Sequence, residues 1–286
     1  MINDKDADFY HENGYIVVDD VYSMTEVKAM RSVVEELVEK SRKVADHNDI
    51  YDLEPTHSAD NPRVRRIKEP FKVHPLYREM VEHPNIISTM NKLIGVNQRL
   101  HGGKINIKAA SFGSPVEWHQ DWAFYPHTND DLTTVGIYLE DCFEKNGPLK
   151  IIKKSHKKKL YNHHDNEKFF VGKINTKKDK IGFNKSVSIT GNAGTVVFFH
   201  CRSIHGSGHN LMNTSRPLIL FGYRACDAWP LINDGNPHPE IDYKNYNQNI
   251  IVGKNSIKPR LTKVPTIIPL PKKRHYVSIY ELQKSK

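Results

Sequence analysis

The order of hydrophobic patterns along the chain is the feature that most restricts its fold. Before about residue 97 most apolar residues recur at helical spacing, whereas from about residue 98 they fall in short extended segments. These segments span residues 99–110, 132–139, 148–152, 195–200 and 217–224. Turn-forming pairs such as Asn146-Gly147 and Asn213-Thr214 separate them. Helices followed by many short strands favour a mainly β fold, a sandwich or barrel with flanking helices.

The first third of the chain carries two helix signals. Ser23 and Glu26 fit a capping box, and the apolar residues behind them predict a helix that runs to about residue 42. Residues 76–93 predict further helix, ended by Gly95. A short strand is expected over residues 15–18, and the polar residues 47–66 are expected to form a loop.

The length and composition are typical of one folded domain. The chain has 286 residues, of which 38% are hydrophobic and 26% charged, as in an ordinary globular protein. We expect a single domain over residues 1–286, with a helical N-terminal part over about 1–97, a β core over about 98–230 and a C-terminal extension over about 231–286. Residues 156–188 lack a regular period, which is typical of a long loop that acts as a lid.

Charge and targeting signals indicate a protein without a membrane partner. The chain has no run of about 18 apolar residues, and its acidic start lacks a secretory signal, so we expect a cytoplasmic location. The spacing of Cys142, Cys201 and Cys226 indicates reduced thiols. The net charge is +9, but the lysine clusters have little aromatic interleaving, which disfavours a nucleic-acid partner. The sequence specifies no oligomeric state.

The pair His119 and Asp121 is the sharpest local motif. On an extended segment residues i and i+2 point to the same face, so these side chains would direct an imidazole and a carboxylate toward a common point. A second histidine from another strand would complete the two-histidine, one-carboxylate set that is diagnostic of non-haem iron(II) oxygenases. Alone the pair is weak evidence, because the chain contains 16 histidines.

Residues 194–210 offer three candidates for the second histidine. His200 directly follows an apolar run, as a histidine buried in the core would. His209 lies beyond a flexible Gly-Ser-Gly segment. His205, which precedes Gly206, is the best placed to project inward, because the glycine lets the backbone approach a metal closely.

Several motifs together resemble the phytanoyl-CoA dioxygenase family of Fe(II)- and 2-oxoglutarate-dependent oxygenases. The matching segments are HQDWAFYPHTNDD (119–131), NGPLKIIKKSHK (146–157), GTVVFFH (194–200) and IHGSGHN (204–210), with a weaker match, FYHENGYIVV, from Phe9. The resemblance spans about residues 9–230 and implies a double-stranded β-helix, the cupin-like jelly roll. It favours His205 over His200 and His209. The implied metal ligands, and catalytic centre, are His119, Asp121 and His205.

The same resemblance implies a binding site for 2-oxoglutarate. Arg216, eleven residues after His205, would pair with the far carboxylate of 2-oxoglutarate, since a guanidinium suits that geometry. Ser207 matches a family hydroxyl near that carboxylate. Lys108 falls where many members carry a pocket lysine, although Ala-Ala follows it in place of the more usual Pro-Pro, and Lys104 is a weaker candidate on the same face. O₂ would be the second co-substrate, with ascorbate as a candidate reductant.

The prime substrate is expected to be a small anion. Trp122 and Tyr125 follow the metal motif and would line the pocket, with packing in the core as the alternative. Arg202 and Arg224, together with Lys108, would make the pocket cationic. We therefore expect hydroxylation of a small anionic metabolite such as a carboxylate, a phosphonate or a carrier-linked acyl group, with release of succinate and CO₂. The presence of the metal carboxylate favours hydroxylation over halogenation.

Three other functions use the same residues. A zinc hydrolase would share the metal ligands but has no use for Arg216. A nucleic-acid demethylase would need the lysine clusters around the pocket mouth and room for a flipped base. A non-catalytic protein that binds metal or a small molecule on the same fold is the main alternative, and turnover distinguishes it from an oxygenase.

Overall fold

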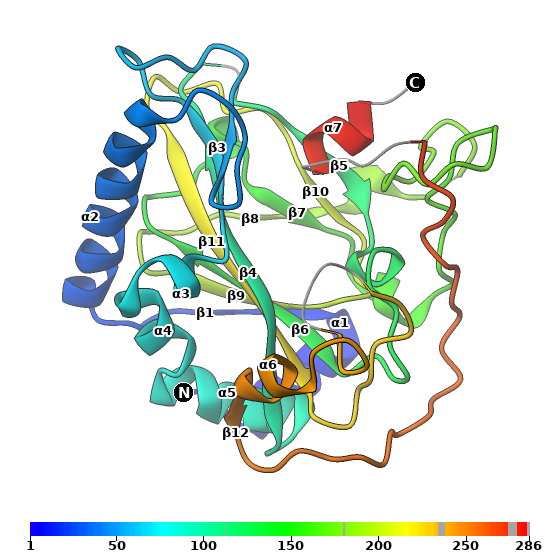
Figure 1. Ribbon diagram of the computed structural model, residues 1–286. Helices are drawn as coiled ribbons and strands as arrows, with labels where there is room; N and C mark the ends of the chain where they lie inside the picture. Colours follow the sequence, from blue (N-terminus) through cyan, green and yellow to red (C-terminus); the bar gives the residue numbers. More distant parts are fainter. Residues whose placement is uncertain (112, 180, 234–237, 274–278, 285–286) are drawn as a thin grey trace.

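Two antiparallel sheets face each other, and helices cover the outer side of the larger one (Figure 1). The computed structural model describes residues 1–111, 113–179, 181–233, 238–273 and 279–284. Within these ranges the architecture is the mainly β, cupin-like jelly roll with flanking helices that the motifs implied. The helices are α1 Asp4–Asn13, α2 Met24–Lys40, α3 Pro70–Val73, α4 Pro75–Val81, α5 Pro84–Ile94, α6 Tyr243–Gln248 and α7 Ile279–Lys284.

From β4 to β11 the chain passes back and forth between the two sheets. The larger sheet has the order β1-β9-β6-β11-β4-β3-β2, with β12 paired to β4, and the smaller has the order β5-β10-β7-β8. The strands are β1 Tyr15–Val18, β2 Tyr51–Leu53, β3 Val64–Lys68, β4 Gln98–Lys108, β5 Val116–His119, β6 Leu132–Tyr138, β7 Leu149–Ile151, β8 Val187–Ile189, β9 Val196–His200, β10 His205–Ser207, β11 Arg216–Ala225 and β12 Ile250–Val252.

The N-terminal helices begin where side chains can cap them. At α2 the backbone N–H of Glu26 donates to the Ser23 hydroxyl over 3.3 Å, and the backbone N–H of Ser23 donates to the Glu26 carboxylate over 2.7 Å. The expected helix over 76–93 is instead two helices, α4 and α5. Pro84 explains the break, because it lacks an N–H and occupies the first turn of α5.

The polar stretch 47–66 was expected to be a loop, and this prediction was wrong. It contains β2 and the start of β3, which extend the larger sheet beyond β4. The charged side chains of Arg66 and Lys68 line a cavity, which explains how a strand of the sheet can contain them. Helix α1 was also not expected, and its Asn3 cap and Gly14 end give it a defined start and stop.

Strand β4 shows how the larger sheet separates core from cavity. Ile105 and Ile107 belong to the apolar core under the helices, whereas Lys104 and Lys108 line a cavity of about 580 Å³ between the sheets. Alternation along one strand produces both surfaces. The cavity is therefore a product of the period-two pattern in β4 and its neighbours.

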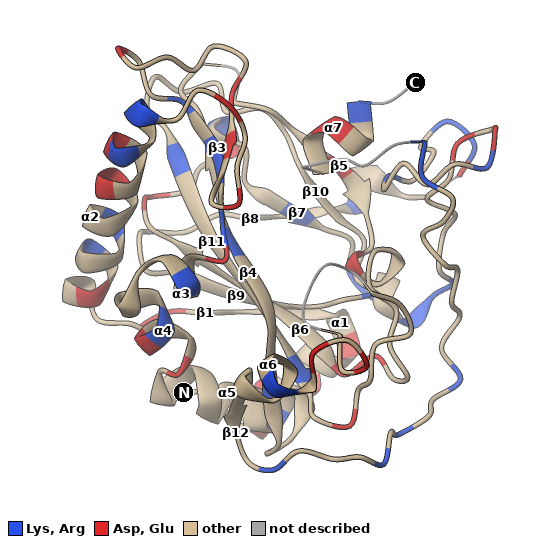
Figure 2. Cartoon of the chain, in the orientation of Figure 1, with Lys and Arg blue, Asp and Glu red and all other residues tan. Residues whose placement is uncertain are grey.

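The C-terminal extension follows the surface before it returns to the cavity. After α6 and β12 it runs without regular structure along the lower and right edges of the molecule in Figure 1, and it carries several basic residues (Figure 2). Helix α7 then packs near β5 and adds Ile279, Tyr280 and Leu282 to the cavity wall. In the described ranges no helix combines the length and the apolar character needed to cross a lipid bilayer.

Candidate active site

Paired strands of the smaller sheet bring two of the expected ligands together. His119 is the last residue of β5 and His205 is the first residue of β10, and the two are register partners in the antiparallel pair. Their imidazole centroids lie 4.1 Å apart. The strand ends at His119, so Asp121 does not lie in the extended strand that the sequence suggested. It begins a single helical turn over Asp121–Ala123, and the extended backbone of Gln120 keeps it on the same side as His119.

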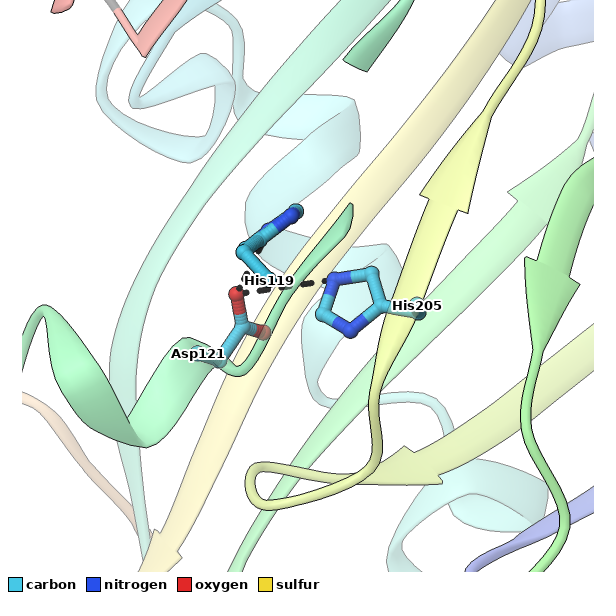
Figure 3. A group of neighbouring side chains, drawn as sticks. All are labelled: His119, Asp121 and His205. Atoms are coloured by element: carbon cyan, nitrogen blue, oxygen red, sulfur yellow. Dashed lines mark ion pairs between the residues drawn. The ribbon is translucent and has the colours of Figure 1, made fainter. Parts of the chain in front are cut away.

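The three side chains converge on one point (Figure 3). The Oδ1 atom of Asp121 lies 3.5 Å from Nε2 of His119 and 3.7 Å from Nε2 of His205. One potential ligand atom from each residue lies within 4.8 Å of the others, and all three residues are buried. Such a set covers one face of an octahedron and leaves three positions open, as an Fe(II) site for O₂ chemistry requires.

The backbone fixes both histidines in the form that binds a metal. Nδ1 of His119 is 2.7 Å from the Glu117 carbonyl oxygen, and Nδ1 of His205 is 2.9 Å from that of Ser203. In each case Nδ1–H donates to the carbonyl, so the Nε2 lone pair faces the common point. These contacts fit the ligand set to a divalent metal ion.

The protonation states also suit a metal ion. Burial and the neighbouring His119 lower the pKa of His205 to about 4, so its imidazole is neutral at pH 7. Burial alone would raise the pKa of Asp121, but His205 and His119 hold it well below its usual range. The Thr134 hydroxyl donates to Oδ2 of Asp121 over 3.1 Å and orients the carboxylate. The site thus offers a neutral His205 imidazole and an ionised Asp121 carboxylate without prior loss of protons from these two groups.

Arg216 and Lys108 form a buried cationic pair in the same cavity. Arg216 begins β11 directly opposite Lys108 on β4. The guanidinium donates to the carbonyl oxygens of Asn146 (3.1 Å) and Gly147 (2.8 Å), and its Nη1 has no hydrogen-bond partner among the described residues. A buried donor without a partner costs free energy unless a ligand accepts from it. The pair therefore fits the far carboxylate of 2-oxoglutarate.

Lys108 is held toward the cavity by two carbonyl groups. Its ammonium donates to the backbone oxygens of Ser114 and Gly208, each over 2.7 Å, which leaves one of its three N–H donors for a ligand. Burial and the adjacent charge of Arg216 lower the pKa of Lys108 to about 7. Binding of a carboxylate would stabilise its charged form.

The remaining predicted residues divide between the cavity and the surrounding protein. Ser207, Lys104 and Tyr125 line the cavity with the metal ligands. Burial and the charge of Asp121 raise the pKa of Tyr125 well above its usual value, so its hydroxyl stays protonated. Three other residues were expected to contact the substrate: Trp122, Arg202 and Arg224. All three are described by the structure, and none of them lines the cavity.

Each of those three side chains has a structural partner instead. Trp122 is fully buried in a core cluster, and its indole N–H donates to the Pro265 carbonyl over 3.0 Å. Arg202 pairs with Asp130 at 3.0 Å. Arg224 is buried beside His127, to which its guanidinium donates. In the structure, the polar groups of these three side chains contact other protein groups and do not face the cavity.

The sequence pattern missed two groups of cavity residues. Arg66 and Lys68 come from β3, which begins inside the stretch 47–66 expected to be a loop, and Tyr280 comes from α7 in the expected surface tail. The β-branched residues Val64 and Ile67 were a weak strand signal for β3. A six-residue helix near the end of the chain has no comparable signal.

Comparison with known proteins identifies relatives across nearly the whole chain. The chain is 34% identical over 282 residues to a "Probable alpha-ketoglutarate-dependent hypophosphite dioxygenase" of Stutzerimonas stutzeri, covering 96% of this chain and 95% of that protein. It is 26% identical over 253 residues to an "Ectoine dioxygenase" of Bordetella parapertussis, covering 81% of this chain and 79% of that protein.

Solved structures agree on the fold. The iron-bound crystal structure of EctD from S. alaskensis superimposes with a TM-score of 0.68 at 20% identity, over 94% of this chain and 89% of that one. The carbocyclase SnoK from nogalamycin biosynthesis has a TM-score of 0.61 at 24% identity, over 80% and 86% of the two chains. The family model described as "Phytanoyl-CoA dioxygenase (PhyH)" matches residues 10–218. The chain therefore belongs to the phytanoyl-CoA dioxygenase family and is an Fe(II)- and 2-oxoglutarate-dependent dioxygenase.

Proposed function

We propose that the protein oxidises a small anion at the site formed by His119, Asp121 and His205. The observation that supports this most is the charge of the cavity into which the three ligands open. Among the residues that the structure describes, two carboxylates, Glu69 and Asp121, line it together with many more cations. The lining cations are Arg66, Lys68, Lys72, Lys104, Lys108, Arg216 and Lys272. Such an excess of positive charge attracts anions and raises their concentration at the cavity.

The chain's own residues have separate tasks in this reaction. When bound, Fe(II) and 2-oxoglutarate supply the activation of O₂, with release of succinate and CO₂. His119, Asp121 and His205 would hold the metal with its open positions toward the cavity. Arg216 and Lys108 would fix the far carboxylate of 2-oxoglutarate, with the Ser207 hydroxyl near them. Apolar side chains of the wall would exclude water from the reacting groups.

Hypophosphite is the first anion to test, because the relative that is 34% identical carries that activity in its name. Its oxidation replaces one P–H bond by a P–OH bond and yields phosphite. One oxygen atom of O₂ enters phosphite and the other enters succinate. The P–H bond and the oxidative decarboxylation of 2-oxoglutarate each supply two electrons, which together reduce one O₂. Organic carboxylates, phosphonates and carrier-linked acyl groups are the other substrate classes to compare.

We also propose that residues 1–286 act as one oxygenase domain. The cavity wall draws on the N-terminal part through Arg66, on the β core through Lys108 and on the C-terminal extension through Tyr280. A site built from all three parts needs them folded together. Phe170, from the long irregular segment 156–188, also lines the cavity, and the role of that segment as a lid stays a prediction.

The test of this function is turnover of defined anions under ¹⁸O₂. The iron-loaded protein with 2-oxoglutarate and hypophosphite should form phosphite and succinate in equal amounts, each with one labelled oxygen. His205→Ala should abolish both products, and His209→Ala, which changes an exposed histidine, should retain them. If no anion of the panel stimulates succinate formation, the proposed substrate class is wrong.

A further inference from the structure

Besides Arg216 and Lys108, the cavity wall holds a second group of cations on neighbouring strands. Lys68 on β3 is the register partner of Lys104 on β4, and Arg66, two residues earlier, lies on the same face of β3. Lys104 and Lys108 are four residues apart on β4, so their Cα atoms are separated by roughly 13 Å along the strand. The wall therefore carries two distinct centres of positive charge.

The ion pairs of the acidic groups beside the second centre do not include Lys104. Asp52 is fully buried and pairs with Arg66 at 2.5 Å and with Lys68 at 3.4 Å. Glu69 pairs with Lys72 at 3.4 Å. In the part of the chain that the structure describes, the Lys104 ammonium has neither a hydrogen bond nor an ion pair, although it lines the cavity. Lys104 thus brings to the cavity a positive charge that no described carboxylate pairs with, which leaves room for a negative charge on a ligand.

Lys104 lies closer along β4 to the metal ligands than Lys108 does. Gly102, two residues before Lys104, is paired through Gly222 of β11 with Thr134 of β6, whose hydroxyl bonds the Asp121 carboxylate. Lys108 is six residues from Gly102 and lies opposite Arg216, so Lys104 is on the metal side of Lys108 in this sheet. The buried amide oxygen of Asn106, the next residue on that face, has no hydrogen-bond partner among the described residues and could accept from a ligand hydroxyl.

We propose that Lys104, Arg66 and Lys68 form the subsite for the anionic group of the prime substrate, and that this group is a phosphorus oxyanion. A guanidinium fork and two ammonium groups offer donors to two or three oxygens of a tetrahedral centre. If these donors bound the oxygen atoms beside the metal, a P–H bond of the substrate would stay accessible to oxidation. Lys104 then contacts substrate, and the family-based expectation that it binds 2-oxoglutarate is replaced. The inference rests on the proposed function of the same cavity.

The test is a crossed binding experiment on metal-free protein, so that it does not depend on turnover. Hypophosphite and 2-oxoglutarate are titrated separately by calorimetry into the wild type, Lys104→Met, Lys104→Arg and Arg216→Lys. Lys92→Met serves as a matched control, because Lys92 pairs with Asp4 on the surface. Thermal unfolding of each variant checks that the fold is kept.

We expect opposite patterns for the two cationic centres. Lys104→Met should weaken hypophosphite binding at least about tenfold, the loss of one charge-assisted hydrogen bond, and leave 2-oxoglutarate binding unchanged. Lys104→Arg should restore part of the affinity. Arg216→Lys should weaken 2-oxoglutarate and spare hypophosphite. Lys92→Met should change neither affinity.

Three results would overturn the subsite. They are absence of hypophosphite binding to the wild type, equal hypophosphite affinity in Lys104→Met, and loss of 2-oxoglutarate binding in Lys104→Met. Failure of the proposed function is distinguishable, because it appears as absent succinate formation by the iron-loaded wild type even where hypophosphite binding depends on Lys104.

Discussion

His205 lies directly opposite His119 across the paired strands β10 and β5, and each histidine contacts the carbonyl oxygen of the residue two positions before it. The backbone of the smaller sheet therefore sets both the separation and the tautomer of the imidazoles. Because strand pairing does this, the two histidines are in place before a metal arrives.

His205→Ala should remove a metal ligand, whereas His200→Ala and His209→Ala should leave three ligands in place. We expect Fe(II) affinity to fall at least about 100-fold in the first variant and to change little in the other two. Competition with a metal chelator measures the affinity. Loss of binding in His209→Ala with retention in His205→Ala would reverse the ligand assignment.

Thr134→Val should weaken the site without removing a ligand. The Thr134 hydroxyl donates to Oδ2 of Asp121, so its loss leaves the carboxylate free to rotate. Partners of this kind are worth about 10- to 100-fold in metal affinity or activity. Thr195→Val is the control, because its hydroxyl bonds Asp19 instead. Equal Fe(II) affinity and kcat in Thr134→Val and the wild type would contradict this role.

The lowered pKa of Lys108 predicts how the stability of the metal-free protein depends on pH. In the folded protein this pKa is lowered from 10.5 to about 7, so the unfolded chain binds more protons between these values and stability of the metal-free protein rises with pH there. Lys108→Met should flatten that rise.

The carboxylate of 2-oxoglutarate favours the protonated amine, so binding should take up a proton above pH 7. Affinity should then fall by up to about tenfold per pH unit as the pH rises above 7. Calorimetry in buffers of different ionisation enthalpy measures the proton uptake. A pH-independent affinity in the wild type, or the same slope in Lys108→Met, would refute this assignment.

Gln283 of α7 connects the C-terminal extension to β5, the strand that ends at His119. Its side chain accepts from the Glu117 backbone N–H over 2.9 Å and donates to the Gly172 carbonyl over 2.8 Å. Gln283→Ala should cost about 1–3 kcal/mol of unfolding free energy and should raise uncoupled succinate formation as water enters. Lys284→Ala, at the exposed end of the helix, is the control. Unchanged stability and coupling in Gln283→Ala would show that α7 does not close the cavity.

Much of the fold was predictable because the strands of the larger sheet have clear boundaries. Residues 132–139 and 195–200 correspond to β6 and β9, where apolar runs end at turn residues. The β3 strand was hidden, since two of its five residues line a cavity and stay charged. The sequence carries no sign that β3 and α7, which lie far apart in the chain, both add residues to the cavity wall.

The candidate site was predictable to the extent that its residues lie in local motifs. His119, Asp121 and His205 come together as the resemblance implied. Trp122 and Arg202 lie in or beside the same motifs, but their side chains make packing contacts. Trp122 belongs to the single helical turn that begins at Asp121, and Arg202 pairs with Asp130. Side-chain direction in irregular segments depends on tertiary packing, which no local pattern encodes.

The most direct test of the Fe(II)- and 2-oxoglutarate site is an anaerobic titration followed by O₂. Wild-type protein with Fe(II) and 2-oxoglutarate should develop a weak visible charge-transfer band, and added O₂ should bleach it with release of succinate. His209→Ala should behave in the same way, and His205→Ala and Asp121→Ala should show neither signal. Absence of both signals in folded wild-type protein, or their persistence in His205→Ala, would contradict the account.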